Sequence, residues 1–316
     1  DLGLDYSLFD GRLYGKFDYY RRKIDNLLYS VKVPQPPYTQ GSQYQNIGSM
    51  ESKGWEFEIG GDIIQNKEFT WTSNLNMSHT TGKILTLWGN NTYYNGNGFV
   101  APGTPGDAAR IEEGSTIGSF YIWKFAGFDD DGNFLLYNKD GEVIPADKKT
   151  ENDKQFMGNY TPKLILGWNN TFSYKNFDLG INMRSWIDFD VYNTINMYYG
   201  IQDRGNTNVL KEAYGKFNHI KGEKQICDYY LEDGTFLKID AITLGYTLNM
   251  KKYTNNLVDR IRVYATVGNV CTITGYSGMN PEVNITGWDQ GTEKFWDTGS
   301  FYPMVRTYTL GMQFNF

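Results

Sequence analysis

The sequence predicts an all-β protein, an antiparallel transmembrane β-barrel, and three observations support that fold class. In residues 302–316, large apolar residues alternate with polar or small ones up to the terminal Phe316. A period of two is typical of a strand whose two faces meet different surroundings, and about 9–11 such residues cross a bilayer at a slant. Several other runs alternate in the same way. The connections between these runs are alternately short and long, as in membrane barrels with tight periplasmic turns and long extracellular loops.

The composition agrees with a barrel wall. The 316 residues include 25 Tyr, 19 Phe and 8 Trp, yet the mean hydropathy is −0.54. No apolar run approaches the ~18 residues that a membrane helix needs, whereas alternation keeps the mean hydropathy of a barrel low. The net charge of −6 disfavours a nucleic-acid partner, which would require a basic face. Two cysteines, Cys227 and Cys271, are too few for a disulfide scaffold, and we expect independent thiols, with one bridge as the alternative.

The first part of the chain predicts two hairpins. An Asp-Gly pair at residues 10–11, set between alternating runs, is a strong signal for a tight turn. A stretch rich in Pro and Gln separates this hairpin from the next one, which turns at Gln65-Asn66-Lys67. We therefore predict strands over residues 2–8, 13–22, 55–62 and 69–78, with a long loop at 23–53.

Between about residues 80 and 161 the alternation is weak. Residues 90–107 have the composition of a loop. The segments around Asp131-Gly132 predict a hairpin, and its arms would either cross the membrane or stand above it. The acidic run that ends at Asp131 could bind a cation, but a solvated turn is the favoured interpretation.

Alternation returns at Leu164 and continues to the end of the chain. The turns at Lys175-Asn176 and at 249–259 are short, whereas 192–234 and 272–303 are predicted to be long loops. We predict strands over residues 164–174, 177–189, 242–248, 261–267 and 302–316. The total is nine strands, or eleven if the central hairpin spans the membrane, which indicates the C-terminal part of a larger barrel.

A soluble antiparallel sheet with one solvated face is the structural alternative, because such a sheet alternates too. Three features disfavour it. The alternating runs exceed the usual ~5–6 residues of soluble strands. The short connections alternate with long ones, and aromatic residues stand at strand ends, where an interfacial girdle would lie.

Several stretches, taken together, carry a family resemblance. They include KFDYYRRKIDNLLY, NIGSMESKGWEFEI, GSTIGSFYIWKFAGF, DGTFLKIDAITLGYTL and YPMVRTYTLGMQFNF, and they extend over essentially the whole chain. The chain resembles the SusC/RagA family of TonB-dependent outer-membrane transporters of Bacteroidetes, in the C-terminal part of their barrel. It departs from the family at Cys271, where an aromatic residue is more usual, and in the acidic stretch from Asp140 to Asp153. Because a calcium loop needs several carboxylates at fixed spacing, we predict no bound metal, and no cofactor is expected.

The resemblance implies that residues 1–316 are the C-terminal part of one 22-stranded barrel domain. An N-terminal plug and a TonB-binding segment would lie upstream, in a longer precursor that also carries the export signal. Partners implied in this way are a SusD-like surface lipoprotein, the TonB complex, and an oligosaccharide or peptide ligand, with a dimer of transporter–lipoprotein pairs as one arrangement. The implied function is active import of oligomeric nutrients. A passive diffusion pore and a surface adhesin or structural barrel are the alternatives.

No arrangement of residues indicates an enzyme. The two histidines, His79 and His219, are far apart in the sequence. There is no Ser-His-Asp order, metal-ligand spacing or phosphate-binding loop.

Candidate ligand-binding residues are aromatic residues of the long loops and charged residues of the polar face. Aromatic faces suit stacking on sugars or peptides, and polar groups suit hydrogen bonding. For any single aromatic residue, packing within the loops or contact with the lipoprotein is the favoured alternative. The candidates are Tyr93, Tyr94, Tyr198, Tyr199, Trp288, Trp296, Arg184 and Arg262.

The last two apolar residues, Phe314 and Phe316, continue the row that would face the outer-membrane lipid. Barrels that the chain resembles end in an aromatic residue that the insertion machinery recognises. We therefore assign Phe314 and Phe316 to barrel closure and assembly.

Overall fold

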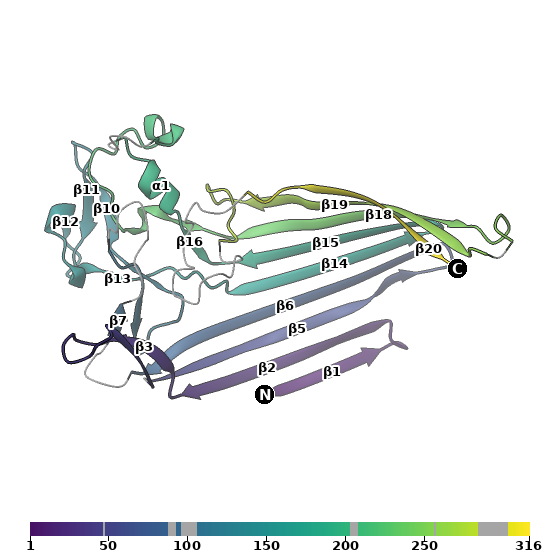
Figure 1. Cartoon of the computed structure of the whole chain (residues 1–316), viewed down its shortest axis with the longest axis horizontal. Helices are drawn as coiled ribbons and strands as arrows, with labels where there is room; N and C mark the ends of the chain where they lie inside the picture. The colour runs from purple at the N-terminus through teal and green to yellow at the C-terminus, as the bar shows by residue number, and fades with distance from the viewer. Residues whose placement is uncertain (47, 88–92, 96–105, 203–207, 256, 284–302) are drawn as a thin grey trace.

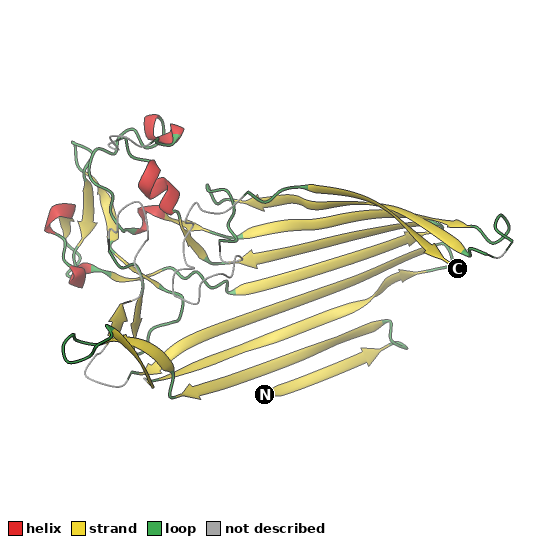
Figure 2. Ribbon diagram, in the orientation of Figure 1, coloured by secondary structure: helices red, strands yellow, loops and turns green. Residues whose placement is uncertain are grey.

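The computed structural model has two parts, a long twisted sheet and a smaller folded region at one end of it (Figures 1 and 2). The structure describes residues 1–46, 48–87, 93–95, 106–202, 208–255, 257–283 and 303–316. Strands dominate throughout, and the helical segments are short and confined to the smaller region (Figure 2). Within the described residues, no helix is long and apolar enough to cross a membrane.

The long sheet, which we call the wall, contains nine antiparallel strands. Each strand pairs with its neighbour in the order β1-β2-β5-β6-β14-β15-β18-β19-β20. The strands are β1 (Leu2–Leu8), β2 (Leu13–Asp25), β5 (Ser49–Gln65), β6 (Phe69–Thr86), β14 (Leu164–Tyr174), β15 (Phe177–Ile187), β18 (Phe236–Asn249), β19 (Arg260–Thr274) and β20 (Thr307–Asn315). The prediction of nine strands without the central hairpin is confirmed.

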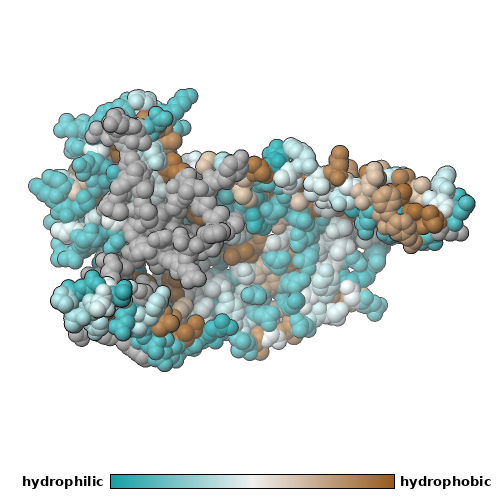
Figure 3. Space-filling model, viewed as in Figure 1, coloured by the Kyte–Doolittle hydropathy of each residue, from teal (hydrophilic) through white to brown (hydrophobic). Residues whose placement is uncertain are grey.

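Alternation along each strand gives the wall two different faces. Directly paired residues of antiparallel strands lie on the same face. Leu310 of β20 pairs with Ala265, which pairs with Leu244 of β18, and all three belong to the apolar face. The residues between them, such as Thr309 and its partner Thr266, form the polar face. In Figure 3, hydrophobic side chains gather around the C-terminal strand.

The pairing is staggered from strand to strand. A row of paired residues that starts at the beginning of β20 ends beside the turn between β1 and β2. It runs through Tyr308, Val267, Ile242, Ile181, Asn170, Ser73, Gly61, Leu13 and Leu8. Strands that tilt relative to a barrel axis require this stagger.

Short turns connect the strands at one end of the wall, and longer connections lie at the other end (Figure 1). In the first turn, Phe9, Asp10 and Gly11 all have positive φ, with 84° at Gly11, where a residue without Cβ is favoured. The turn after β5 is closed by Asn66, whose Oδ1 accepts hydrogen bonds of 3.0 and 2.8 Å from the N–H groups of Glu68 and Phe69. The predicted asymmetry of the connections is confirmed.

The described parts of residues 106–162 and 189–234 form the smaller region, which we call the cap. Its paired strands are β9 (Phe120–Ile122) with β13 (Gln155–Met157), β10 (Lys124–Phe128) with β11 (Phe134–Tyr137) and β12 (Val143–Pro145), and β16 (Asp190–Tyr192) with β17 (Leu231–Asp233). Its helices are α1 (Thr194–Tyr199) and 3-10 turns at Ala146–Lys148, Glu151–Asp153, Lys211–Tyr214 and Asp228–Tyr230. The hairpin around Asp131-Gly132 therefore belongs to the cap and does not span the membrane.

Two further hairpins stand next to the wall. β3 (Leu28–Lys32) pairs with β4 (Ser42–Asn46), and β7 (Tyr93–Asn95) pairs with β8 (Arg110–Glu112). Both Cys227 and Cys271 are free, so the expectation of independent thiols is confirmed.

Several strands are longer than the alternation predicted. β2 continues to Asp25, β5 begins at Ser49 and β6 continues to Thr86. Together with β3 and β4, the extensions of β2 and β5 make most of the predicted 23–53 loop strand. β18 begins at Phe236 and β19 ends at Thr274. Outside the predicted membrane span the two faces would not meet lipid and water, which accounts for an apolar–polar period that fades while the hydrogen-bonded ladder continues. The described part of the region 192–234, predicted to be a loop, contains helical turns and β17, because its apolar residues pack in the core of the cap.

Candidate functional site

The polar face of the wall accommodates tyrosine rings by placing glycine opposite them. Tyr14 pairs with Gly60 and Tyr264 pairs with Gly311. A Cβ at Gly60 would lie 2.5 Å from the Tyr14 ring, and one at Gly311 would lie 2.4 Å from the Tyr264 ring. The glycines therefore let these rings lie across the neighbouring strand, which makes a smooth and hydrogen-bonding surface.

An ion pair crosses the polar face near the short turns. Arg262 of β19 donates from Nε to Asp178 Oδ1 of β15 at 2.9 Å, and its Nη2 donates to Asp178 Oδ2. The pair passes over Gly245 of β18, where a Cβ would lie 2.4 Å from Asp178 Oδ1. This two-point geometry is the strong form of an arginine–carboxylate contact. Arg262, a predicted ligand-binding residue, is thus already engaged by Asp178.

Arg184, the other predicted charged residue, belongs to a group of four charged side chains at the far end of β15 and β18. Its Nη2 lies 2.7 Å from Glu282 Oε1 and its Nε lies 3.2 Å from Asp240 Oδ2. Lys238 donates a hydrogen bond of 2.7 Å from Nζ to Glu282 Oε2. The side chains of Lys238 and Glu282 are 2% and 0% exposed. Two cations and two anions balance here, so no net charge is buried.

A β-bulge positions one of the four. Asp240 lies between Ile239 and Ala241, where the pairing of β18 with both neighbours shifts by one residue. An extra residue in a strand redirects its side chain. In this case it brings the Asp240 carboxylate to Arg184 on the polar face.

The segment that carries Glu282, residues 275–283, is held by the wall and by the cap. Tyr276 and Val283 pack in a buried apolar cluster with Phe189, Val191 and Phe236. Toward the cap, the N–H and the hydroxyl of Ser277 each donate a 2.8 Å hydrogen bond to Glu232 of β17. Segment 275–283 therefore links the charged group of the wall to the cap.

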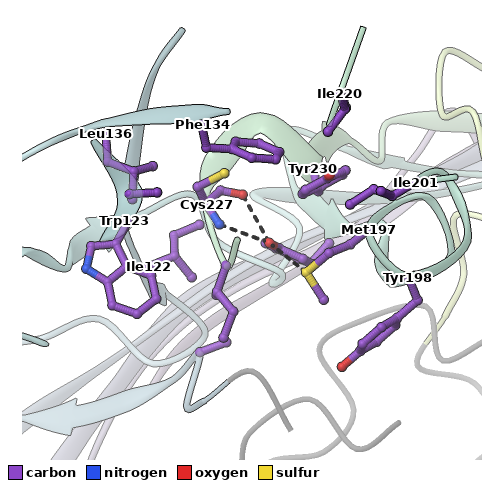
Figure 4. Close-up of a cluster of buried hydrophobic side chains, with 14 of the residues drawn as sticks. Ile122, Trp123, Phe134, Leu136, Met197, Tyr198, Ile201, Ile220, Cys227 and Tyr230 are labelled. Carbon is purple, nitrogen blue, oxygen red and sulfur yellow. Dashed lines mark hydrogen bonds between the residues drawn. The ribbon is translucent and has the colours of Figure 1, made fainter. Parts of the chain in front are cut away.

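The cap has a dense apolar core of its own (Figure 4). Ile122, Leu136, Met197 and Cys227 are all fully buried. The Tyr192 hydroxyl accepts a 3.1 Å hydrogen bond from Cys227 N–H and donates one of 3.1 Å to the Cys227 carbonyl oxygen. Burial raises the pKa of the Cys227 thiol well above its usual value, so this thiol is inert.

Two of the predicted aromatic residues lie in α1 of the cap. Tyr198 is 3% exposed and belongs to the apolar core (Figure 4), which agrees with the favoured alternative of packing within the loops, and its role in binding stays a prediction. The reason for its burial is that α1 turns one side of its six residues, including Met197 and Tyr198, toward the core. Tyr199 is partly buried against the same core, and its role in binding stays a prediction.

The structure does not describe the side chains of the remaining aromatic candidates. Tyr93 and Tyr94 belong to β7, of which only the backbone is described. Trp288 and Trp296 lie outside the described residues. Their part in binding stays a prediction.

Phe314 and Phe316 lie at the end of β20, the last strand of the wall. Phe314 pairs with Ile261 on the apolar face, and Phe316 follows the last residue of the strand. They are 49% and 85% exposed, as lipid-facing residues of a wall would be. Their role in assembly stays a prediction.

The acidic run of the cap forms a turn. Asp129 accepts hydrogen bonds from the N–H of Asp131 at 3.0 Å and from the N–H of Asn133 at 2.8 Å. Hydrogen bonds from Asn133 hold the pKa of Asp129 below its usual value. No group of three or more His, Cys, Asp or Glu side chains could hold a metal ion in the part of the chain that the structure describes.

Sequence reasoning missed Lys238, Asp240, Glu282 and Glu232. One signal was present for the first two. In FLKIDAITL, two opposite charges stand two residues apart in an otherwise apolar stretch, just before the predicted start of a strand. No comparable local signal marks Glu282 or Glu232, because their partners are 44 and 45 residues away in the sequence.

Comparisons with known proteins show which family of proteins the chain resembles. Residues 1–270 match the family model described as TonB dependent receptor-like, beta-barrel. The TonB-dependent receptor P3 of Formosa agariphila is 31% identical over 100% of this chain and 34% of its own length. The TonB-dependent receptor SusC of Bacteroides thetaiotaomicron is 30% identical over 99% of this chain and 31% of its own length. The chain thus spans about a third of the length of these relatives.

A solved structure has the same fold. The structure titled "Structure of the RagAB peptide transporter" superposes with a TM-score of 0.79 at 23% identity, covering 99% of this chain and 34% of that chain. At this level of identity the likeness concerns the fold alone. It includes the cap as well as the wall, because nearly all of the chain is covered.

Proposed function

The chain belongs to the TonB-dependent receptor β-barrel family, and from this premise we propose that it forms part of a transporter that actively imports oligomeric nutrients across the outer membrane. The family consists of outer-membrane receptors, not enzymes. The observation that carries the proposal is the wall, in which nine strands have one apolar and one polar face. A sheet of this kind suits a bilayer on one side and an aqueous interior on the other.

We propose that the TonB complex supplies the energy and acts through an N-terminal plug domain of the intact receptor. Along β15, β18 and β19, the polar face offers a ligand hydrogen bonds from hydroxyl and amide groups, and two sets of charged side chains there are paired with each other. Arg262 and Asp178 neutralise each other, as do the four charges around Glu282. Such a surface suits a polymer fragment that is neutral or carries both kinds of charge. A fragment of this kind can bind and then be released for transport.

The proposed ligand is a glycan or a peptide fragment, and the proposed partner is a SusD-like surface lipoprotein at the cap end of the wall. Similarity to SusC supports this partner, because it extends over the cap as well as the wall. The RagAB structure is named as a peptide transporter. For this chain, peptide fragments are one of the two proposed ligand classes, and glycan fragments are the other.

The test is uptake by cells that carry the intact receptor, its deletion, or a deletion of the lipoprotein gene. Labelled oligopeptides and labelled oligosaccharides are supplied separately. We expect one class to enter only when both genes are present, and entry to stop when the proton gradient is dissipated. Uptake that persists without the gradient would identify a passive pore and contradict the proposal. Unchanged uptake of both classes after receptor deletion would contradict it as well.

A further inference from the structure

The apolar face of β2, β5 and β6 changes its character toward the cap end. Near the turns it carries Phe17 paired with Phe57, and Phe57 paired with Met77. The next outward row is a belt of ring side chains, Tyr19, Trp55 and His79. The ring centroids of Trp55 and His79 lie 6.1 Å apart. Beyond this belt the outward positions become charged. They are Arg21, Lys53 and Thr81 in one row, and Lys23, Glu51 and Lys83 in the next.

The strand lengths place these charges beyond the hydrocarbon core of the membrane. Lys53 and Lys83 lie 12 and 14 positions from Gln65 and Phe69, the ends of β5 and β6 at their shared turn. About 9–11 tilted strand residues cross the hydrocarbon core. Trp and Tyr rings sit at the boundary between acyl chains and headgroups. Both lysines therefore stand at the level of the headgroups on the side opposite the short turns, which is the outer leaflet.

Positive charge at this level is only partly neutralised by neighbouring residues. Arg21 is paired with Glu51, with 2.6 Å between Nη2 and Oε2, and Lys23 is paired with Asp25 at 2.9 Å. Lys53 and Lys83 are both exposed, and neither forms an ion pair with another described residue. Four cations thus face two anions, in a chain whose net charge is −6.

We propose that Lys53 and Lys83 bind the phosphate groups of lipid headgroups in the outer leaflet, above the Tyr19–Trp55–His79 belt. A lysine ammonium group is a compact point charge that suits phosphate. The site is continuous with the lipid-facing band of the same three strands, so a lipid whose chains lie against Phe57 and Met77 reaches the lysines with its headgroup. This inference rests on the membrane placement of the wall and does not depend on import.

β18 and β19 differ from β2, β5 and β6 at this level. On β18 and β19 the outward pair at a similar distance from its turn is Leu237 with Ile273. These side chains are 40% and 61% exposed and uncharged. A general rim of charge around the wall would have placed polar residues there too. At this level β18 and β19 therefore carry no counterpart of the charges on β2, β5 and β6.

The test compares lipid binding by the purified intact receptor in detergent, measured by native mass spectrometry. The probes are phosphorylated lipid A and the same lipid after removal of its phosphates. The variant is Lys53→Gln with Lys83→Gln, and the matched control is Lys251→Gln with Lys252→Gln, two lysines of the turn at the other end of the wall. A basic side chain near an anionic lipid surface contributes about fivefold to binding, so we expect the first variant to bind phosphorylated lipid A on the order of twentyfold more weakly.

The control is expected to bind both lipids as the parent does, and the Lys53/Lys83 variant is expected to bind the phosphate-free lipid as the parent does. Equal binding of phosphorylated lipid by the two variants would overturn the proposal. An equal loss for both lipids in the Lys53/Lys83 variant would also overturn it, because contact with the chains would then explain the effect. Displacement of the lipid by inorganic phosphate at matched concentration would indicate a site for soluble anions and reject the lipid assignment.

Discussion

The wall and the cap are stabilised in different ways. In the wall, large apolar residues such as Leu310 and Tyr308 are 85% and 73% exposed, and the strands are held by the ladder and by lipid. In the cap, residues such as Leu136 and Tyr192 are 0% exposed and pack against one another, as in a soluble domain. A single chain therefore uses lipid as the apolar environment in one region and its own side chains in the other.

The two regions also differ in how repetitive their contacts are. Four of the eight wall pairings join strands across a short turn, and the other four, such as β6 with β14, cross longer segments, but all of them repeat the same hydrogen-bonded ladder. The cap is closed by distant pairs. Trp123 N–H donates to the Ile226 carbonyl oxygen at 3.1 Å, and Phe125 N–H donates to Asp228 Oδ1 at 2.6 Å. The cap therefore depends on contacts that are each different, whereas the wall depends on many similar ones.

The strongest test of this comparison is at the junction, where segment 275–283 joins the two regions. Replacing Glu282 by Leu leaves Arg184 and Lys238 with one anion between them, and we expect a loss of about 3–5 kcal/mol in the stability of the segment. The double variant Lys238→Met with Glu282→Leu restores neutrality and should be less destabilised than the single variant. Hydrogen exchange of the amides of residues 275–283 measures both. A double variant that is as unstable as the single one would show that geometry, not charge balance, holds the junction.

In the cap, Leu136→Ala should behave like a core mutation in a soluble protein. Leu136 is 0% exposed, and removal of a buried Leu side chain costs about 2–5 kcal/mol through lost burial and the cavity left behind. The matched control is Leu244→Ala in the wall, 52% exposed on the apolar face. Limited proteolysis should cleave the cap of the first variant and leave that of the second intact. Equal cleavage in the two variants would mean that wall and cap unfold as one unit.

At the end of the wall, Phe316 should affect assembly more than the stability of the assembled barrel. One Phe at the membrane boundary contributes about 1.5–3 kcal/mol of burial, which is too little to open a barrel closed by strand hydrogen bonds. A recognition step during insertion, by contrast, depends on the residue itself. The measurement is the amount of heat-modifiable barrel in the outer membrane for the Phe316 deletion and for Thr309→Ala, a change on the polar face. Undiminished amounts for both would show that Phe316 is an ordinary wall residue.

The wall could be predicted from the sequence because its signal is local. Alternation, the Asp-Gly pair at 10–11 and the short turn at Lys175-Asn176 lie within a few residues of the structure that they determine. The junction could not be predicted, because Glu282 finds Lys238 only after β18, β19 and segment 275–283 have come together. The same holds for the burial of Tyr198. Its sequence neighbours do not show which residues cover it, because the core is built from distant segments.

The pH dependence of the cap separates two kinds of buried carboxylate. Burial raises the pKa of Asp190 and of Asp228, so both favour the folded cap more strongly as the pH falls toward ~4, the usual value for Asp. Burial also opposes ionisation of Asp153. Hydrogen bonds from the Thr150 hydroxyl, the Lys139 N–H and the Thr150 N–H outweigh it, however, and hold the pKa of Asp153 below its usual value.

The contribution of Asp153 is therefore present above the unfolded pKa of ~3.9 and is lost as the pH falls through the lower folded pKa. We expect the stability of the cap to rise as the pH is lowered toward ~4 and to fall below it. Asp153→Asn keeps one acceptor oxygen, so it should cost only about 1 kcal/mol at neutral pH, but it should remove part of the fall at low pH. The measurement is hydrogen exchange of the amides of β9, β10 and β11 across this range, corrected for intrinsic rates. Identical profiles for the parent and Asp153→Asn would show that the Thr150 and Lys139 hydrogen bonds do not stabilise the ionised carboxylate.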